Sequence, residues 1–221
     1  MALEIGFVVF PNLTQLDFTG PLQVLCRTPD ARCHIIARSL EPVPSDAQLA
    51  ILPTTTFADC PPLDILCVPG GHGVAEAISD AELVGFVRDQ AARATWVTSV
   101  CTGAFILGAA GLLKGKVTAT HWAYRDLLSL YGAIPSAARV ARDGNMMTGG
   151  GVTSGIDFAL TLVAEIASPG VAQSIQLALE YDPVPPFDAG SPRLAPRDVR
   201  ERLEARVYNA ARDRLRAAIE G

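Results

Sequence analysis

Three short, continuous apolar runs constrain the fold of this chain more than any other feature of its sequence. They cover residues 5–10, 65–68 and 96–100, and segments with helical patterns follow them along the chain. Strands that are apolar on both faces are buried on both faces, as in parallel sheets that helices cover. The sequence therefore predicts an α/β fold, in which a mostly parallel sheet carries helices on both of its faces.

The length of the chain is consistent with a single domain. Its 221 residues, 49% of them hydrophobic, are enough to bury a full core. We expect an α/β domain at residues 1–190 and a helical extension of the same domain at residues 191–221. No apolar stretch approaches the roughly 18 residues of a membrane-spanning helix, and the first residues contain no basic leader, so we expect a cytoplasmic protein and no membrane partner.

The distribution of charge argues against a nucleic-acid partner. The net charge is −5, with 10 Lys and Arg against 18 Asp and Glu in residues 1–190. Residues 191–221 contain eight Arg and five acidic residues, so this tail is mildly basic but mixed in sign. An amphipathic helix that packs on the body or on a partner subunit fits this pattern better than a DNA-binding segment.

The cysteines and histidines do not favour a metal site. Five cysteines, an odd number, argue for reduced thiols and against a disulfide scaffold. Six residues separate the partners in the pairs Cys26 and Cys33, and Cys60 and Cys67, whereas zinc ligands usually have two to four between them. The histidines, His34, His72 and His121, share no short ligand spacing. Small buried hydrophobic side chains are the better interpretation of these cysteines.

Cys101 lies at a turn between a predicted strand and a predicted helix. Residues 96–100 favour a strand, and residues 103–112 favour a helix of small and apolar residues. A thiol on such a turn lies above the sheet at a helix N-terminus, where the dipole is expected to lower its pKa and the Thr102 amide can face a developing negative charge. A buried, inert cysteine is the alternative, but the strand, Cys, Thr-Gly and helix together favour a nucleophile.

Two glycine-rich segments are candidates for the walls of a site. The first, PGGHG at residues 69–73, follows the strand at 65–68, and the Gly71 amide could be a second donor to the developing charge; an ordinary tight turn is the alternative. The second, TGGGVTSG at residues 148–155, leads into an apolar helix predicted at 152–166. Neither segment matches the G-x-G-x-x-G pattern of dinucleotide-binding proteins.

Asp17 is an acid between two apolar residues, just after the first predicted strand. We expect it in a loop, because Thr19, Gly20 and Pro21 favour a helix that starts there and runs to about Thr28. A partly desolvated carboxyl beside a thiolate has a raised pKa, which suits proton donation near neutral pH. A helix-capping or loop role is equally compatible with the spacing alone.

Four stretches resemble the ThiJ/PfpI superfamily: VTSVCTGAFILGAAGLLKGKVTATHWAY, DILCVPGG, FPNLTQLDFTGP and GNMMTGGGVTSGIDFALTLVAE. The resemblance covers almost the whole chain, including PPFDAGSP at residues 185–192. It implies a glutamine-amidotransferase-like, flavodoxin-like three-layer sandwich with its cysteine on a nucleophile elbow. The branch that the chain resembles most is the one that hydrates isocyanides.

The resemblance also implies site residues and an activity. Cys101 would be the nucleophile, Asp17 the general acid/base, and Thr102 a hydrogen-bonding catalytic residue, with Gly71 and the turn around Gly150 and Val152 bordering the substrate. The implied reaction is hydration of a small-molecule isocyanide through a covalent thioimidate, by a homodimeric lyase that needs neither a metal nor another cofactor. His121 would have only a structural or pocket-lining role.

Three other functions stay open at this point. Another cysteine-dependent activity of the superfamily, such as a glyoxalase-like or deglycase-like one, is the first alternative. Two differences argue against it: protease-like members carry His immediately after the cysteine, where this chain has Thr102, and glyoxalase-like or deglycase-like members carry Glu at the position of Asp17. A ligand-sensing domain is a second alternative, because transcription regulators share the CTGAF and THW stretches, although about 30 residues after PPFDAGSP are too few for their DNA-binding module. Oxidation of Cys101 in a redox or chaperone role is the third.

Overall fold

A seven-stranded sheet forms the centre of the protein. The computed structural model describes residues 2–221, and the strand order is β10-β11-β7-β6-β1-β2-β5, with every pair parallel except β10 and β11. The strands are β1 (Leu3–Val8), β2 (Ala31–Ala37), β5 (Thr55–Thr56), β6 (Ile65–Val68), β7 (Trp96–Val100), β10 (Val140–Asp143) and β11 (Met146–Gly149). The predicted mostly parallel α/β sheet is confirmed.

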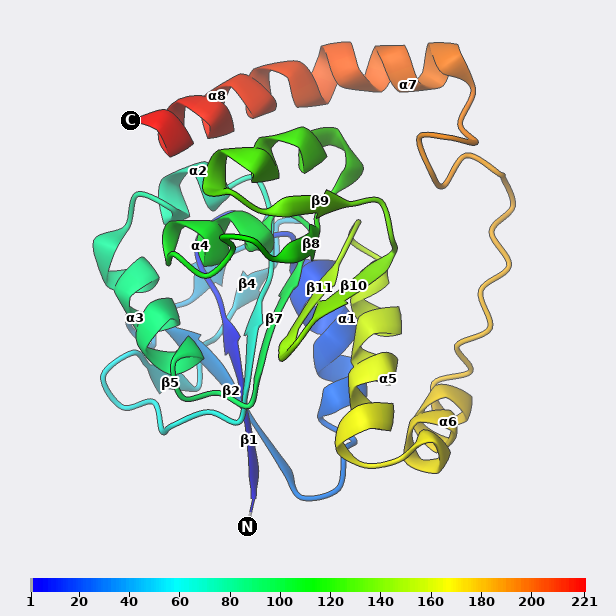
Figure 1. Ribbon diagram of the computed structural model, residues 1–221. Helices are drawn as coiled ribbons and strands as arrows, with labels where there is room; N and C mark the ends of the chain where they lie inside the picture. The colour runs from blue at the N-terminus through cyan, green and yellow to red at the C-terminus, as the bar shows by residue number, and fades with distance from the viewer. Residues whose placement is uncertain (1) are drawn as a thin grey trace.

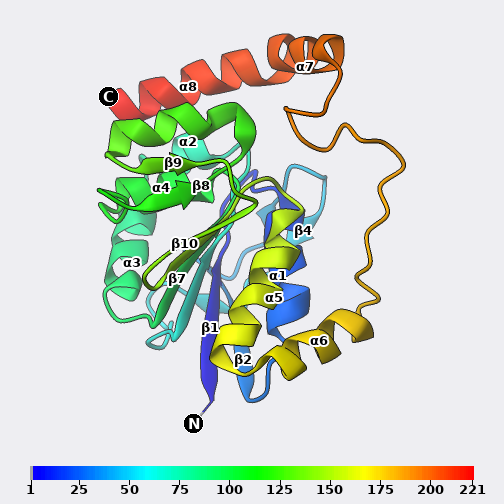
Figure 2. The same ribbon diagram turned by 45° about the vertical axis from the view of Figure 1, so that its right-hand side comes forward.

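Helices cover both faces of this sheet, as Figures 1 and 2 show. On one face lie α1 (Gln15–Leu25), α5 (Ser154–Ile166) and α6 (Pro169–Ala178), and on the other lie α2 (Val74–Ala77), α3 (Ala81–Ala91) and α4 (Gly103–Ala109). Two small sheets, β3 (Val43–Pro44) with β4 (Ala50–Ile51) and β8 (Val117–Ala119) with β9 (Ile134–Ser136), lie outside the main sheet. The three-layer sandwich is therefore present.

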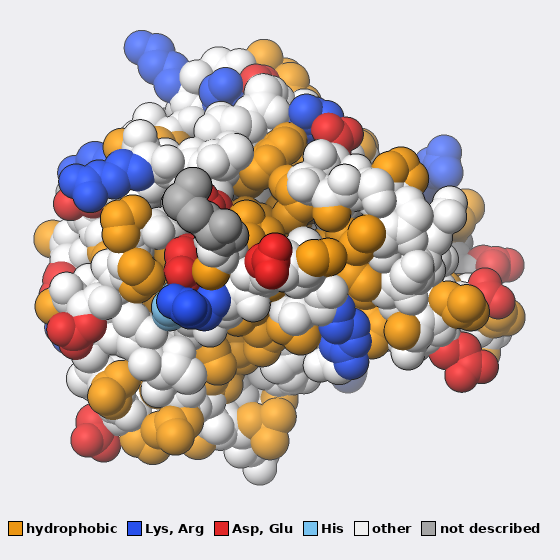
Figure 3. All heavy atoms as spheres, turned by 90° about the horizontal axis from the view of Figure 1, so that it is seen from below, with side chains coloured by type: hydrophobic (Ala, Val, Ile, Leu, Met, Phe, Trp, Pro, Cys, Tyr) orange, Lys and Arg blue, Asp and Glu red, His pale blue; other side chains and the backbone are white. Residues whose placement is uncertain are grey.

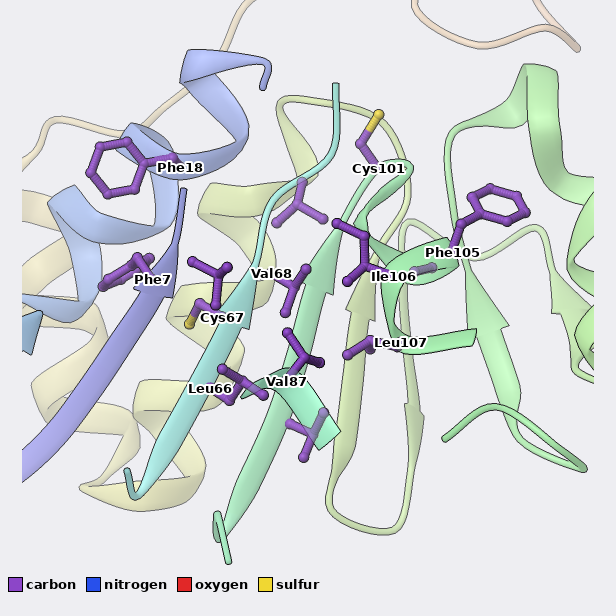
Figure 4. Packing of buried hydrophobic residues seen from close by; sticks show 14 of the residues in the cluster. Phe7, Phe18, Leu66, Cys67, Val68, Val87, Cys101, Phe105, Ile106 and Leu107 are labelled. Carbon is purple, nitrogen blue, oxygen red and sulfur yellow. The ribbon is translucent and has the colours of Figure 1, made fainter. Parts of the chain in front are cut away.

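The core fills the spaces between the sheet and the two helical layers. Phe7, Phe105 and Phe158 are fully buried and come from a strand and from helices on opposite faces. In Figure 4, Leu66, Val68 and Val87 pack between the strands and the adjoining helix, while Cys101 stands above the end of β7. The packed core thus supports the cysteine from below.

Helix α1 begins earlier than its sequence predicts. It starts at Gln15 and not at Thr19, so Asp17 lies in its first turn and not in a loop. The reason is a distant cap: the Asp46 carboxylate accepts hydrogen bonds from the Gln15 N–H at 3.3 Å and the Thr14 hydroxyl at 2.7 Å. These bonds satisfy donors at the start of the helix, a need that a local sequence pattern does not reveal.

The C-terminal residues form one long helical rod across the top of Figure 1. It consists of α7 (Arg197–Leu203), a single π turn η2 (Glu204–Tyr208) and α8 (Asn209–Glu220). The rod packs on α2 and on η1, a 3₁₀ segment at Trp122–Tyr131. Within α7, η2 and α8 only Leu215 is fully buried, and residues 182–196, which connect the rod to the body, are largely exposed.

Two further features concern the surface and membranes. Figure 3 shows the molecule from below, where Lys, Arg, Asp and Glu side chains are scattered among apolar ones and form no single basic patch on that face. Within residues 2–221, no helix combines the length and the apolar character that crossing a membrane requires.

Candidate active site

Cys101 occupies a sharp turn between β7 and α4. Its φ of +55° lies in the left-handed region, which a residue with a side chain enters at a cost of about 1–3 kcal/mol. Two hydrogen bonds hold it there: its N–H donates to the Gly149 carbonyl at 3.1 Å, and the Thr120 hydroxyl donates to its carbonyl at 2.6 Å. The predicted strand, turn and helix around this cysteine are confirmed, and the strained turn directs its sulfur out of the sheet (Figure 4).

The Asp17 carboxyl group lies beside this sulfur. Asp17 is 1% exposed, the Gly70 N–H donates to its Oδ2 at 3.0 Å, and the carboxyl group is close enough to the Cys101 thiol for each group to shift the pKa of the other. Its Oδ1 has no hydrogen-bond partner among residues 2–221. The structure thus brings together two of the predicted site residues, which are 84 positions apart along the chain.

Burial controls the electrostatics of this pair. Desolvation raises the pKa of Asp17 to about 7, as expected from the sequence, even though the Gly70 hydrogen bond and the neighbouring Cys101 side chain oppose the shift. Desolvation also raises the pKa of the Cys101 thiol, and the neighbouring Asp17 charge raises it further, against the N–H and hydroxyl of Thr102. The lowered thiol pKa that the sequence suggested is therefore wrong: burial raises the pKa of the Cys101 thiol, and a charge on Asp17 further disfavours its ionisation.

Thr102 connects the cysteine turn to the loop after β6. Its hydroxyl accepts a hydrogen bond from the Gly71 N–H at 2.9 Å and donates to the Gly71 carbonyl at 3.3 Å, and its own N–H faces the Cys101 sulfur. The Gly71 amide is therefore engaged within the protein. It becomes a donor to a bound group only when the Thr102 hydroxyl turns away, whereas the Thr102 N–H already serves the sulfur.

The glycines of the loop at 69–73 allow this close packing. A Cβ on Gly70 would lie 2.5 Å from the Thr102 nitrogen, and one on Gly71, whose φ is +141°, would lie 2.4 Å from the Thr14 nitrogen. Such distances exclude any larger residue unless the backbone shifts. The loop therefore lets the backbone segments that follow β1, β6 and β7 come together around the sulfur. This meeting point lies at the carboxyl ends of the strands, next to the position between β1 and β6 where the strand order reverses.

A cavity of about 200 Å³ opens above Cys101. It is lined by Thr14, Asp46, Gly71, His72, Cys101, Thr102, His121, Tyr124, Val152 and Tyr208. Of the predicted residues, Cys101, Thr102, Gly71 and Val152 reach it, and so does His121. Asp17 and Gly150 are buried and are not among the lining residues, and the Gly150 N–H donates to the Arg139 carbonyl at 2.9 Å.

Comparison with known proteins places this site in a family. Residues 4–165 match the model of the DJ-1/PfpI family. The chain belongs to the DJ-1/PfpI family. The match covers both the strand that precedes Asp17 and the turn that carries Cys101, and it confirms the superfamily resemblance seen in the sequence.

Several DJ-1/PfpI relatives align with most of the chain. An isonitrile hydratase from Pseudomonas putida is 55% identical over 219 residues, which are 99% of this chain and 95% of that protein. A Parkinson disease protein 7 homolog from Danio rerio is 31% identical over 170 residues, 75% of this chain and 90% of that protein. The crystal structure of a ThiJ/PfpI family protein from Pseudomonas syringae superposes with a TM-score of 0.92 at 47% identity, covering 97% of this chain and 91% of that one.

The site of this DJ-1/PfpI chain includes an aromatic wall that sequence reasoning missed. Tyr208 of the C-terminal rod lies against His121 and Tyr124, with ring centroids 5.1 and 5.8 Å apart, and meets the edge of Trp122 at 5.2 Å. Burial lowers the pKa of His121 to about 4, so its ring is neutral at pH 7. The sequence had given His121 a structural or pocket-lining role, but it did not single out Tyr124 or Tyr208; a tyrosine in an otherwise Arg-rich tail was the one signal for Tyr208.

Metal-binding groups are not clustered in the described part of the chain. No three His, Cys, Asp or Glu side chains within residues 2–221 are arranged to hold a metal ion.

Proposed function

We propose that this protein is a lyase that hydrates isocyanides to N-substituted formamides, with Cys101 as nucleophile and Asp17 as general acid/base. The observation that carries the proposal is the buried Asp17 carboxyl in contact with the Cys101 thiol beneath the cavity. The 55% identity to an isonitrile hydratase over nearly the full chain supports the same activity, since isonitrile is another word for isocyanide.

The first step joins the substrate to the enzyme. The Cys101 sulfur bonds to the terminal carbon of R–N≡C while Asp17 delivers a proton to that carbon and takes the thiol proton in return, giving the thioimidate R–N=CH–S–Cys. A carboxyl with a pKa of about 7 can both give and accept a proton at neutral pH. The Thr102 N–H stabilises negative charge on the sulfur as the proton leaves it.

The second step releases the product. Water adds to the thioimidate carbon with Asp17 as the base, so that one water proton ends on the nitrogen and the other on the sulfur. The C–S bond then breaks, giving R–NH–CHO and the free thiol. All atoms of water appear in the formamide and the regenerated thiol, so no redox partner takes part.

The test is formamide production from an aryl isocyanide by four proteins side by side. Cys101→Ala should lose activity by about 10⁴-fold or more, and Asp17→Asn by about 10²–10⁴-fold. Cys67→Ala is the matched control, because Cys67 is also buried and has a raised pKa of about 12 but lies outside the cavity. It should retain the wild-type rate.

Mass spectrometry adds an intermediate to this test. Wild type quenched during turnover should carry the mass of one isocyanide on Cys101. A wild-type protein with reduced Cys101 and no formamide production would refute the proposal and direct the next assay to dicarbonyl substrates.

Assembly and location belong to the same proposal: a cytoplasmic homodimer in which residues 191–221, as an extension of the domain at 1–190, contribute to the interface. Val199, Leu203 and Val207 are exposed and spaced four residues apart along one face of the rod, which favours an apolar contact with a second copy. Sedimentation of wild type against Leu203→Glu tests this, and a wild-type monomer would refute it.

A further inference from the structure

The rod at 197–220 is tied to the segment that carries the other aromatic residues of the cavity. Arg212 donates two hydrogen bonds of 2.8 Å to the Asp126 carboxylate and another to the Ala123 carbonyl, and both partners lie in η1. Arg214 donates to the carbonyl of His72, another residue that lines the cavity, at 2.7 Å. The rod is therefore held by polar contacts to two separate segments near the cavity.

The π turn directly precedes the helix that carries these two arginines, where the rod passes the aromatic residues. An extra residue in one helical turn changes the direction of the side chains around it, and such turns are frequent at functional sites. Here the π turn ends at Tyr208, which is the only residue of the rod among those that line the cavity above Cys101. The neighbouring Arg206 of the same turn is exposed to solvent.

Hydrogen bonds orient the aromatic wall. The Ala123 N–H donates to His121 Nδ1 at 3.3 Å, so the neutral ring carries its proton on Nε2, which lies 3.5 Å from the Tyr208 hydroxyl. His121, Tyr124 and Tyr208 thus form an uncharged aromatic surface beside the sulfur. The size of the space is also informative: a cavity of roughly 150 Å³ accommodates benzene, and this one measures about 200 Å³.

We propose that Tyr208 is a specificity-determining residue, which closes an aromatic pocket for the N-substituent and makes the enzyme prefer isocyanides with a single aromatic ring over small alkyl ones. This inference rests on the proposed hydratase function and names its substrate class. Stacking and edge contacts between rings favour an aryl group, whereas a methyl group leaves the aromatic wall without a partner.

The test compares phenyl isocyanide with methyl isocyanide, using formamide formation to obtain kcat and KM for each. In Tyr208→Ala, the ratio of kcat/KM for phenyl over methyl should fall about tenfold, mainly through a higher KM for the phenyl substrate. Tyr208→Phe, which keeps the ring, should retain most of the preference. Arg206→Ala is the matched control on the same π turn and should keep the wild-type ratio.

The possible outcomes separate the two proposals. An unchanged ratio in Tyr208→Ala, with both substrates turned over by wild type, overturns the role of Tyr208 and leaves the hydratase function standing. An equal loss of kcat on both substrates also overturns it, because selectivity would then not depend on the ring. No turnover by wild type overturns the hydratase function and the inference with it. Should Tyr208→Ala fail to fold, Tyr208→Leu gives the same comparison.

Discussion

The floor and the wall of the cavity are built in different ways. The floor, formed by Cys101, Asp17 and Thr102, is at least nine-tenths buried and is held by backbone groups of the segments after β1, β6 and β7. The wall at Tyr208 belongs to a rod that buries a single side chain and is held by partly exposed arginines. In the proposed reaction, bond-making would therefore depend on fixed, desolvated groups, and substrate choice on an element with a less buried attachment.

The largest expected effect concerns the ionisation of Asp17. In the folded protein its pKa is about 7, against 3.8 ordinarily, so between these values the folded state binds more protons than the unfolded chain, and stability falls as pH rises. The loss of folding stability that comes from ionising the buried Asp17 is absent below about pH 4. It is complete above about pH 7, where it reaches roughly 4 kcal/mol. Asp17→Asn does not carry this cost, so its free energy of unfolding should rise relative to wild type over this range.

Urea unfolding of wild type and Asp17→Asn at several pH values measures this difference. Asp188→Asn, in the exposed 182–196 segment, controls for the loss of a carboxylate. If the free energy of unfolding changed with pH in the same way for wild type and Asp17→Asn, the floor would tolerate a buried charge. The contrast between floor and wall would then lose its physical basis.

The next effect concerns the backbone packing of the floor. A Cβ on Gly103 would lie 2.2 Å from the Val68 carbonyl oxygen and 2.6 Å from that of Pro69. Gly103→Ala should therefore cost about 2–3 kcal/mol of stability and displace the Cys101 turn, with a large loss of formamide production. Gly85→Ala is the control, because nothing lies within 4 Å of its Cβ and the helix gains about 0.5–1 kcal/mol. Equal stability and equal formamide production of Gly103→Ala and Gly85→Ala would contradict a rigid floor.

The smallest effect is expected at the attachment of the wall. Arg212→Ala removes the paired hydrogen bonds to Asp126, a partly exposed ion pair worth at most about 1 kcal/mol. KM for phenyl isocyanide should rise about threefold, with kcat nearly unchanged. Arg216→Ala, which loses a 4.0 Å contact to the same carboxylate and an exposed pair with Glu220 at 3.6 Å, should have a smaller effect. A fall in kcat at constant KM would show that the rod acts on the floor as well.

Much of the fold and of the floor could be predicted from the sequence. The apolar runs predicted the parallel strands, and the change of pattern at Cys101 predicted the turn, because both depend on local chain preferences. The start of α1 could not be found in this way, since Asp46, whose carboxylate caps it, lies 31 residues after Gln15. The direction of the thiol's pKa shift was missed because burial in three dimensions outweighs the local dipole. Tyr208 was missed because its partners lie more than 80 residues away.

The positive φ of Cys101 has a consequence for how this chain can evolve. Glycine adopts that conformation without strain, so replacing Cys101 by glycine should relieve the turn while removing the sulfur. Random mutation filtered for thermal robustness alone would favour glycine at this position. Under the proposed function, laboratory evolution toward heat tolerance would have to screen for turnover at every round to keep the sulfur.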